Sequence, residues 1–401
     1  MTIPTGLELT VFDETFRERP HERFAALRSA CPVHHDAQMN RYLLTREAEV
    51  AAVLRDRSMS VQRENAAPGS FAHQLNQMLD LDEREPSLLF LDDPRHKRLR
   101  GLVASAFTPR AVEAARPEIA RVADELLDGL SGEVDLIDAY ASPLPIIVIA
   151  AMLGVDPADA PEFRAWALGL SNVFSPIRTP ELTERLARVT DAIERYFFRV
   201  VAERRAAPRD DLLTALVRAE VEGDRLNDRE IVTMATLLLL AGNLTTTDLI
   251  GNAVYQLLSN PDQLALLRAE PGLAGEAVEE TLRRDPPVVQ TMRMPMAELT
   301  LDGVTAPKGA TVVPFLMAAG LDPDVHADPH RFDITRADKR HHAFGGGAHF
   351  CLGAPLARAE ATIALERLFA RLPGLRLADR PIERNLSAAF NGFKELWVVA
   401  N

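Results

Sequence analysis

The hydrophobic and polar positions of this chain alternate mostly with a helical period. Apolar residues recur every three or four positions, and Pro, Gly or Asp interrupts the pattern between segments. The pattern predicts a mainly α protein with small β-sheets. We expect helices over Pro20 to Cys31, Arg46 to Arg55, Ala111 to Leu130, Pro145 to Leu153, Ala160 to Asn172 and Pro180 to Arg205.

One further helix should be longer and more apolar than the rest. It begins near Asn227, whose side chain can cap the first turn while Glu230 reaches back, and it runs to about Ser259. From Ile231 to Leu240 it is apolar nearly all round, which indicates a buried helix. The segment Ala241-Gly242-Asn243-Leu244-Thr245-Thr246-Thr247-Asp248 then places a Gly and three β-branched Thr in the helix interior. A Thr hydroxyl that bonds back to a carbonyl can open the helix and admit water.

Strands are expected to be few and short. Apolar runs predict single strands at Tyr42 to Thr45 and Thr311 to Leu316, a hairpin at Leu299 to Ala306, and the last strands at about Ala388 to Ala400. From Ser58 to Leu91 apolar residues are scattered among polar ones, so we expect loops there.

Composition limits the cellular context. No Pro/Gly/Ser-rich linker, low-complexity tract or repeat divides the 401 residues, so we expect one domain over residues 1–401. The net charge of −13 argues against nucleic acid or an anionic membrane as a partner. Met1 to Asp13 lacks the features of a signal peptide, and the longest apolar runs are too short to span a bilayer. With only 2 cysteines and no disulfide framework, a soluble cytoplasmic protein is expected.

One cysteine, Cys351, lies between a glycine-rich turn and the helical pattern Ala354 to Leu372. A helix N-terminus stabilises a thiolate and suits it to bind a metal. The glycines Gly345 to Gly347 allow positive φ and the close approach of something flat or bulky, against which Phe344 can pack. The loop therefore fits an axial thiolate ligand to haem iron, the kind of ligation that favours O–O cleavage.

Other interpretations of this loop remain open. A lone cysteine is often a small buried apolar residue. A phosphate-binding loop would need Lys-Ser or Lys-Thr after the glycines, and a dinucleotide-binding loop would need a third Gly where Phe350 stands. A zinc site, as in a zinc-dependent hydrolase, could use His341, His342, His349 and Cys351, but with a spacing unlike the usual zinc patterns.

At these residues the chain resembles the cytochrome P-450 family of haem-thiolate monooxygenases, whose haem loop reads Phe-x-x-Gly-x-x-x-Cys-x-Gly. Phe344, Gly347, Cys351 and Gly353 occupy its fixed positions. Further motifs follow in the family's order over nearly the whole chain, which is similar to the soluble bacterial type. The resemblance implies the cytochrome P-450 fold, with haem b held between the long central helix and the cysteine loop.

The resemblance also implies catalytic roles. Cys351 would be the axial ligand of the iron, and Thr245 would support protonation and O–O cleavage. The family has an acid before this Thr, but here Leu244 stands in its place, and a leucine cannot relay a proton. We expect Thr245 with an ordered water, or else Asn243 or Asp248, to carry the proton.

The other site residues follow from the same resemblance. Glu280 and Arg283 match a structural Glu-x-x-Arg pair, although a surface ion pair would be the default interpretation of such a spacing. The implied cofactor contacts are the propionate ligands His96, Arg100, Arg293 and His349, together with Ala241, Gly242, Phe344, Gly345 and Gly353.

The implied function is insertion of one oxygen atom from dioxygen into a small or medium apolar substrate. No flavin- or NAD-binding stretch occurs, so electrons should come from a separate ferredoxin and its reductase, which supply them from NAD(P)H to a monomeric enzyme. Exposed arginines such as Arg98 and Arg110 would dock an acidic ferredoxin. Two alternatives are a peroxide-using oxygenase, favoured by Leu244, and a non-catalytic protein that binds haem or a ligand.

Overall fold

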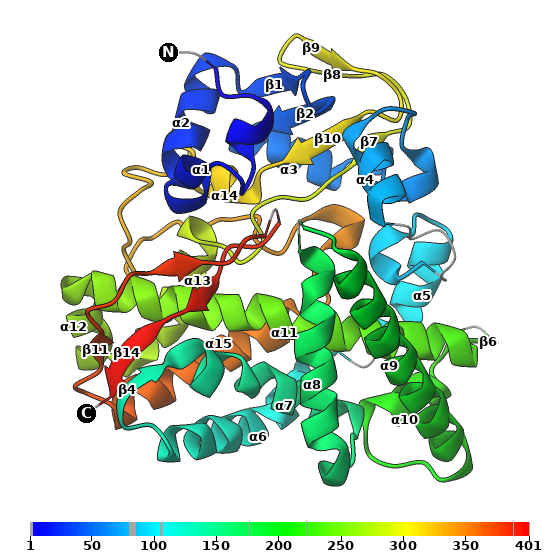
Figure 1. Cartoon of the computed structure of the whole chain (residues 1–401), viewed down its shortest axis with the longest axis vertical. Coiled ribbons are helices and arrows are strands. Elements are labelled where there is room, and N and C mark those ends of the chain that lie inside the picture. The colour runs from blue at the N-terminus through cyan, green and yellow to red at the C-terminus, as the bar shows by residue number, and fades with distance from the viewer. Residues whose placement is uncertain are drawn as a thin grey trace. The chain divides into compact units, whose positions relative to one another are not determined.

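The computed structural model describes residues 3–79, 86–104, 107–175, 177–221, 223–387 and 389–400. These residues form mostly helices with small sheets (Figure 1), as the sequence predicted. They divide into two compact units, each assembled from three separate segments of the chain. The first unit comprises Met1–Pro94, Glu279–Cys351 and Leu386–Asn391, and the second comprises Arg95–Val278, Leu352–Asn385 and Gly392–Asn401. The single domain over residues 1–401 stays a prediction.

A three-stranded sheet of order β1-β2-β10 organises the first unit. Strand β1 (Val33–Asp36) runs antiparallel to β2 (Arg41–Leu44). Strand β10 (Thr311–Pro314) runs parallel to β2, in a register that places Val313 beside Leu43. All four residues of β2 are buried, because both faces of the sheet are covered. The apolar run that predicted this strand therefore shows no alternation with polar residues.

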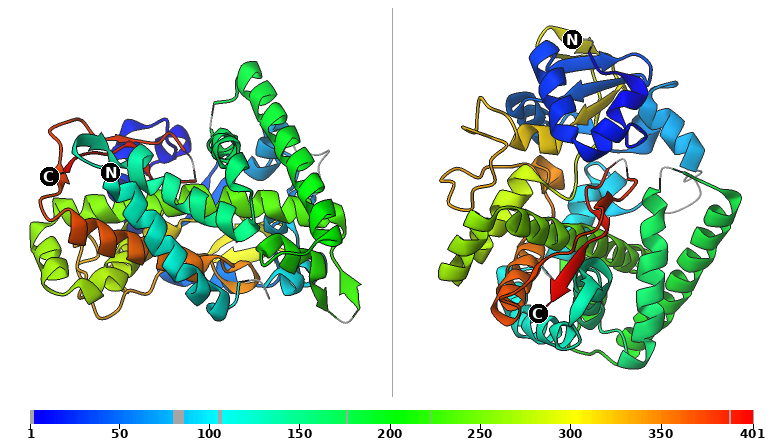
Figure 2. Two further views of the ribbon diagram at one scale, coloured as in Figure 1. Left: turned by 90° about the horizontal axis from the view of Figure 1, so that it is seen from below. Right: turned by 60° about the vertical axis from the view of Figure 1, so that its left-hand side comes forward.

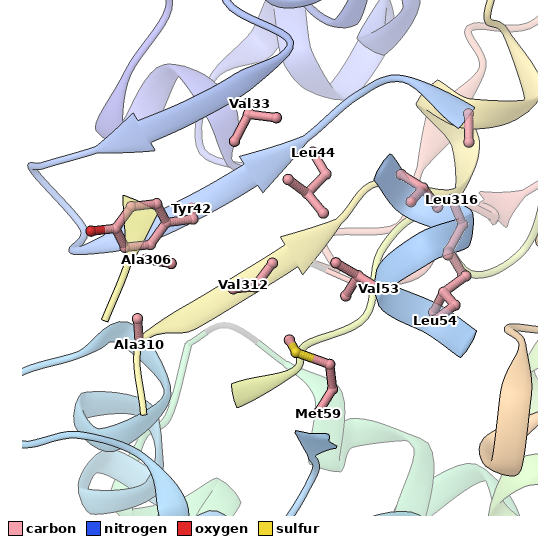
Figure 3. Close-up of a cluster of buried hydrophobic side chains, with 12 residues drawn as sticks. Val33, Tyr42, Leu44, Val53, Leu54, Met59, Ala306, Ala310, Val312 and Leu316 are labelled. Carbon is pink, nitrogen blue, oxygen red and sulfur yellow. The ribbon is translucent and has the colours of Figure 1, made fainter. Parts of the chain in front are cut away.

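Two apolar clusters cover the two faces of this sheet. Tyr42, Leu44 and Val312 belong to the cluster shown in Figure 3, which also contains Val53 and Leu54 of helix α3 (Glu47–Arg55). Alternate residues of the same strands, Leu43 and Val313, belong to the second cluster, together with Leu9, Phe16, Phe24, Leu27 and Phe315. Alternation of side chains along a strand explains why neighbouring residues join different clusters.

The other elements of the first unit are short. Its helices are α1 (Glu14–Glu18), α2 (Pro20–Ala30), α3 (Glu47–Arg55), α4 (Phe71–Leu79), α14 (Leu316–Gly320) and the second half of α13 (Ala274–Arg284); its remaining strands pair as β3 (Met59–Ser60) with β7 (Met294–Pro295) and β8 (Leu299–Leu301) with β9 (Val304–Ala306). The two helices predicted here and the hairpin are confirmed. The loop expected from Ser58 to Leu91 is wrong in part, since it contains β3 and α4, and residues 80–85 of it lie outside the described ranges. The strand expected to reach Leu316 ends at Pro314.

The second unit packs around helix α11 (Asp228–Ser259), the long helix predicted from the sequence. The capping box is confirmed: Glu230 N–H donates to Asn227 Oδ1 and Asn227 N–H donates to Glu230 Oε2, each at 2.9 Å. By length and composition α11 is also apolar enough to cross a membrane, a test that the core helix of a soluble protein passes as well. The expectation that no apolar run is long enough to span a bilayer counted only uninterrupted apolar runs, whereas α11 also contains polar residues.

Helices of the same unit surround α11, and a small sheet of order β11-β14-β4 adjoins them. Figure 2 shows α8 and α9 side by side, joined by ring contacts such as that of Phe163 with Phe197. The remaining elements are α5 (Arg95–Ala104), α6 (Pro109–Asp128), β4 (Gly132–Asp135), α7 (Pro143–Leu153), α8 (Ala160–Ser171), α9 (Pro180–Ala206), α10 (Leu212–Arg218), β5 (Glu220–Val221), β6 (Asp224–Arg225), α12 (Pro261–Ala269), α15 (Ala354–Arg371), β11 (Arg376–Leu377), β12 (Glu383–Arg384), β13 (Phe393–Glu395) and β14 (Trp397–Ala400).

Candidate active site

The loop that precedes Cys351 folds back on itself within the first unit. The Cys351 N–H donates to the Phe344 carbonyl at 2.9 Å, and the Gly345 N–H donates to the His342 carbonyl at 2.8 Å. Phe344 also contacts Phe350, with ring centroids 6.3 Å apart. These contacts hold a turn at whose end Cys351 is exposed.

The glycines of this loop are required by its backbone and by α3 beneath it. Gly345 and Gly347 have φ of 73° and 62°, in the left-handed region that favours glycine, whereas Gly346 is extended. A Cβ at Gly347 would collide with the backbone carbonyl of Leu54 at the end of α3. The positive φ expected from the sequence is thus found at two of the three glycines.

Arg293 in the first unit is a buried cation suited to an external carboxylate. Only 6% of the residue is exposed, and its guanidinium donates to Thr291 Oγ1 at 3.0 Å and to the Met292 carbonyl at 2.8 Å. Among the described residues no carboxylate lies within ion-pair distance of it. Burial lowers the pKa of Arg293 to about 10, against the weaker opposing effect of Asp92. A haem propionate would supply the missing negative charge.

The other predicted propionate ligands lie on helix α5 and in the cysteine loop. His96 and Arg100 lie one turn apart on α5 of the second unit, His96 buried and Arg100 half-buried. His349 lies in the cysteine loop of the first unit and is half-buried.

Helix α11 has an open stretch in an otherwise buried sequence. Ala241 is exposed, and a Cβ added to Gly242 would meet no atom within 4 Å. The Thr245 Oγ1 donates to the Ala241 carbonyl at 2.8 Å, and Leu244 beside it is half-buried. Small residues therefore leave room at this stretch for a flat group or a small molecule, which fits the haem and dioxygen that the sequence implies.

The pair Glu280 and Arg283 on α13 is fully buried rather than on the surface. The Arg283 Nε and Nη2 donate to the two Glu280 oxygens, each at 2.8 Å, and both side chains have 0% exposure. The Arg283 Nη1 also donates to the Gly320 and Pro329 carbonyls, at 2.7 and 2.9 Å. A Cβ at Gly320 would collide with the Arg283 carbonyl, which explains the glycine there. The pair thus connects α13 to the chain that leads to the cysteine loop.

One buried acid on α15 was missed from the sequence. Glu360 is 2% exposed, and burial raises its pKa to about 8, although Thr246 on α11 hydrogen bonds its carboxyl group. Its spacing gave a signal, since Leu356 and Ile363 lie on the same face of an apolar helix and are buried with it. At neutral pH this carboxyl group is therefore protonated.

Of the two arginines expected to be exposed for docking, one is paired with carboxylates. Arg98 is not a free surface cation, because it donates to Asp224 and Glu230, each with a shortest distance of 2.5 Å, and is tied to the first turn of α11. Arg110 is exposed as expected.

The zinc alternative lacks support: within the described ranges no group of three or more His, Cys, Asp or Glu could hold a metal ion. The Nε2 atoms of His341 and His342 instead lie 3.2 and 3.0 Å from Glu279 and Glu47 carboxylate oxygens.

Comparison with known proteins identifies the family. The cytochrome P-450 family model matches residues 273–373, from the start of α13 through the cysteine loop and α15. Cytochrome P-450 107B1 of Saccharopolyspora erythraea is 41% identical over 412 residues, which cover 99% of this chain and 98% of the relative. The chain belongs to the cytochrome P-450 family.

Two further members of the cytochrome P-450 family show the range of relatives. The vitamin D(3) 25-hydroxylase of Pseudonocardia autotrophica is 40% identical and covers 93% of this chain and 92% of its own length. The crystal structure of CYP109E1 from Bacillus megaterium in complex with corticosterone has a TM-score of 0.87 and 34% identity, with 97% of this chain and 100% of that chain covered. The family, the fold class and the bacterial type predicted from the sequence are confirmed.

This cytochrome P-450 is a haem-dependent monooxygenase. Its cofactor is haem b, and it inserts one oxygen atom from dioxygen into an organic substrate with electrons from separate redox partners. The haem supplies the oxidising chemistry, while the protein orients the substrate, limits access of water and controls protons.

Proposed function

We propose that Cys351 is the axial thiolate ligand of the haem and that Thr245 supports protonation during O–O cleavage. The observation that carries the proposal is the exposed Cys351 at the end of a loop that packs on α3 through Gly347, where a Cβ would collide with the Leu54 carbonyl. Ala241, Gly242, Phe344, Gly345 and Gly353 are assigned to the space around the haem, and His96, Arg100, Arg293 and His349 to its propionates. Glu280 and Arg283 are structural.

Electrons come, in this proposal, from a ferredoxin and its reductase to a monomeric cytoplasmic enzyme that acts on a small or medium apolar substrate. Half-buried leucines beside the open stretch of α11, such as Leu237, Leu238 and Leu244, support an apolar substrate. Arg110 is one exposed candidate for docking an acidic ferredoxin.

The test is turnover of a substrate panel by the holoenzyme with NADH, a ferredoxin and its reductase, compared with turnover driven by hydrogen peroxide. We expect product only with the redox partners, at a rate that falls as salt screens the docking charges, over a Debye length of about 10 Å at 0.1 M. Product with peroxide alone would favour the peroxide-using oxygenase that Leu244 suggests. A salt-independent rate would contradict docking through charged groups.

Replacing Arg293 with glutamine should separate its proposed role toward haem from a role in folding. Charge-assisted hydrogen bonds contribute about 1.5–3 kcal/mol, so R293Q should lose haem to an acceptor protein about ten- to a hundredfold faster. The haem-free protein should be unchanged or more stable, because an unpaired buried charge is removed. The control is Arg41, which is also buried, at 1% exposure, but is paired with Asp36 at 3.0 Å. R41Q should destabilise the haem-free protein; the same loss in R293Q would contradict the assignment.

A further inference from the structure

Asp248 on α11 is a buried carboxyl group that the proposed roles leave unexplained. It is 1% exposed, and its Oδ2 has no hydrogen-bond partner in the structure. Its Oδ1 lies against Gly392, where a Cβ would collide with the carboxyl group. A buried polar atom without a partner is uncommon in native proteins and points to a functional group or to a water that joins it.

The surroundings of Asp248 keep it protonated at neutral pH. Burial raises the pKa of Asp248 to about 8, and only the more distant charge of Arg384 opposes this. The Arg384 guanidinium lies over the ring of Phe393, at 4.5 Å, and near that of Tyr255, at 6.0 Å. Asp248 can therefore release a proton near physiological pH, and the field of Arg384 favours the carboxylate that would remain.

The position of Asp248 on α11 brings it close to the residues that need an acid. It follows Thr245 by three positions and Leu244 by four, and residues at these spacings are neighbours on a helix surface. Thr245 already donates its hydroxyl hydrogen to the Ala241 carbonyl, so its oxygen can only accept a further hydrogen bond. A donor must therefore supply any proton that Thr245 passes on, and an ionised carboxylate could not do so.

The other polar residues of this segment are less suitable donors. The Thr247 hydroxyl donates to Asn243 Oδ1 at 3.4 Å, so the Asn243 side chain already has a hydrogen-bond partner other than Thr245. Glu360 is protonated as well, but its carboxyl group bonds Thr246 rather than Thr245. Among the described residues of this segment, Asp248 is the neutral acid that stands three positions after Thr245 and four after Leu244 on the helix.

We propose that Asp248 supplies, through the Thr245 hydroxyl, the proton that the family's acid would supply from the position of Leu244. This rests on the proposed role of Thr245. The reaction consumes one dioxygen, one substrate, two electrons from the redox partner and two protons, and it yields hydroxylated substrate and one water. Asp248 gives one of these protons, remains as a carboxylate, and takes a proton back from solvent before the next turnover.

Infrared spectroscopy of the holoenzyme tests the protonation of Asp248 without turnover. The parent should show C=O stretching bands of protonated carboxyl groups at pH 7, one of which is absent in D248N and titrates near pH 8 in the parent. Asparagine keeps the size of the side chain beside Gly392 but has no acidic proton. E360Q is the matched control, and it should remove a different band. If D248N leaves every such band in place, Asp248 is ionised and the proposal is overturned.

Coupling measurements test the role of that proton. D248N should form at least about tenfold less product per NADH, since general acid catalysis contributes a factor of about 10²–10⁴, while NADH is still oxidised. E360Q should change this ratio much less, and adding L244E to D248N should restore it by returning an acid to the family's position. An unchanged ratio in D248N, failure of the rescue, or a loss that follows E360Q instead would overturn the proposal. Failure of the proposed function would differ: without the Cys351 ligand the parent itself would lack the spectrum of a haem thiolate, and without a role for Thr245 the T245A variant would keep the parent's ratio of product to NADH.

Discussion

Replacing Cys351 with serine is expected to abolish product formation and to remove the long-wavelength absorbance that the reduced carbon monoxide complex of a haem thiolate shows. A thiolate donates electron density to iron and favours O–O cleavage, which a serine hydroxyl at the same position cannot do. The change replaces only the sulfur atom of an exposed side chain with oxygen, so the loop should keep its backbone hydrogen bond to Phe344 and its packing on α3. Visible spectra of the reduced protein with carbon monoxide, and product analysis, provide the measurement.

The chain contains its own control, because Cys31 is the only other cysteine. Its Sγ donates to the Val33 carbonyl at 3.0 Å at the end of α2, and burial raises the pKa of its thiol, so it is not a thiolate at neutral pH. Replacing Cys31 with serine should preserve both the spectrum and the activity. Loss of the haem-thiolate spectrum in the Cys31 variant, or its survival in the Cys351 variant, would refute the assignment of the axial ligand.

The second large effect concerns the buried ion pair of α13. Replacing Glu280 with glutamine keeps the shape but leaves the Arg283 guanidinium, at 0% exposure, without its counter-charge. Removing one partner of a buried pair costs about 3–5 kcal/mol. Glu280 Oε1 also accepts from the Asp333 N–H at 3.0 Å and from Arg336 Nε at 3.3 Å, so the loss extends to the chain before the cysteine loop. The midpoint of urea unfolding should fall strongly, and haem content with it.

A pair with the same spacing on the surface provides the matched control. Glu118 and Arg121 on α6 are also three positions apart and hydrogen bonded, but their side chains are 39% and 51% exposed. An exposed pair contributes about 0.2–1 kcal/mol, so replacing Glu118 with glutamine should hardly change the midpoint. Similar shifts in the two variants would show that burial does not determine the contribution of the Glu280 pair.

The features that the sequence predicted well are local ones. The start of α11 follows from the reciprocal bonds of Asn227 and Glu230, and its burial follows from an apolar run. The cysteine loop was recognisable because its glycines stand at fixed spacings that the backbone requires. Helix α4 was missed although Phe71, Leu75 and Met78 have helical spacing, since the surrounding polar residues suggested a loop.

The features that were missed depend on contacts between residues far apart in the chain. Arg98 was expected on the surface, but its partner Asp224 lies 126 residues further on. Many glutamates occur in helices, and nothing in the local sequence alone shows that Glu360 meets Thr246 of α11. The same limit applies to Asp248, because its environment includes Gly392 from the last segment of the chain. The pKa of a buried acid is set by such neighbours, so the acids of this site became interpretable only in the folded structure.

The two units alternate along the chain, which has a consequence for synthesis on the ribosome. The first unit receives its last segment at Leu386–Asn391, and the second at Gly392–Asn401, where β14 becomes the central strand between β11 and β4. Neither unit can reach its final set of contacts until the residues from Leu386 onward have left the exit tunnel. Nascent intermediates must therefore keep apolar surface exposed until then, and such chains are prone to aggregate in that period.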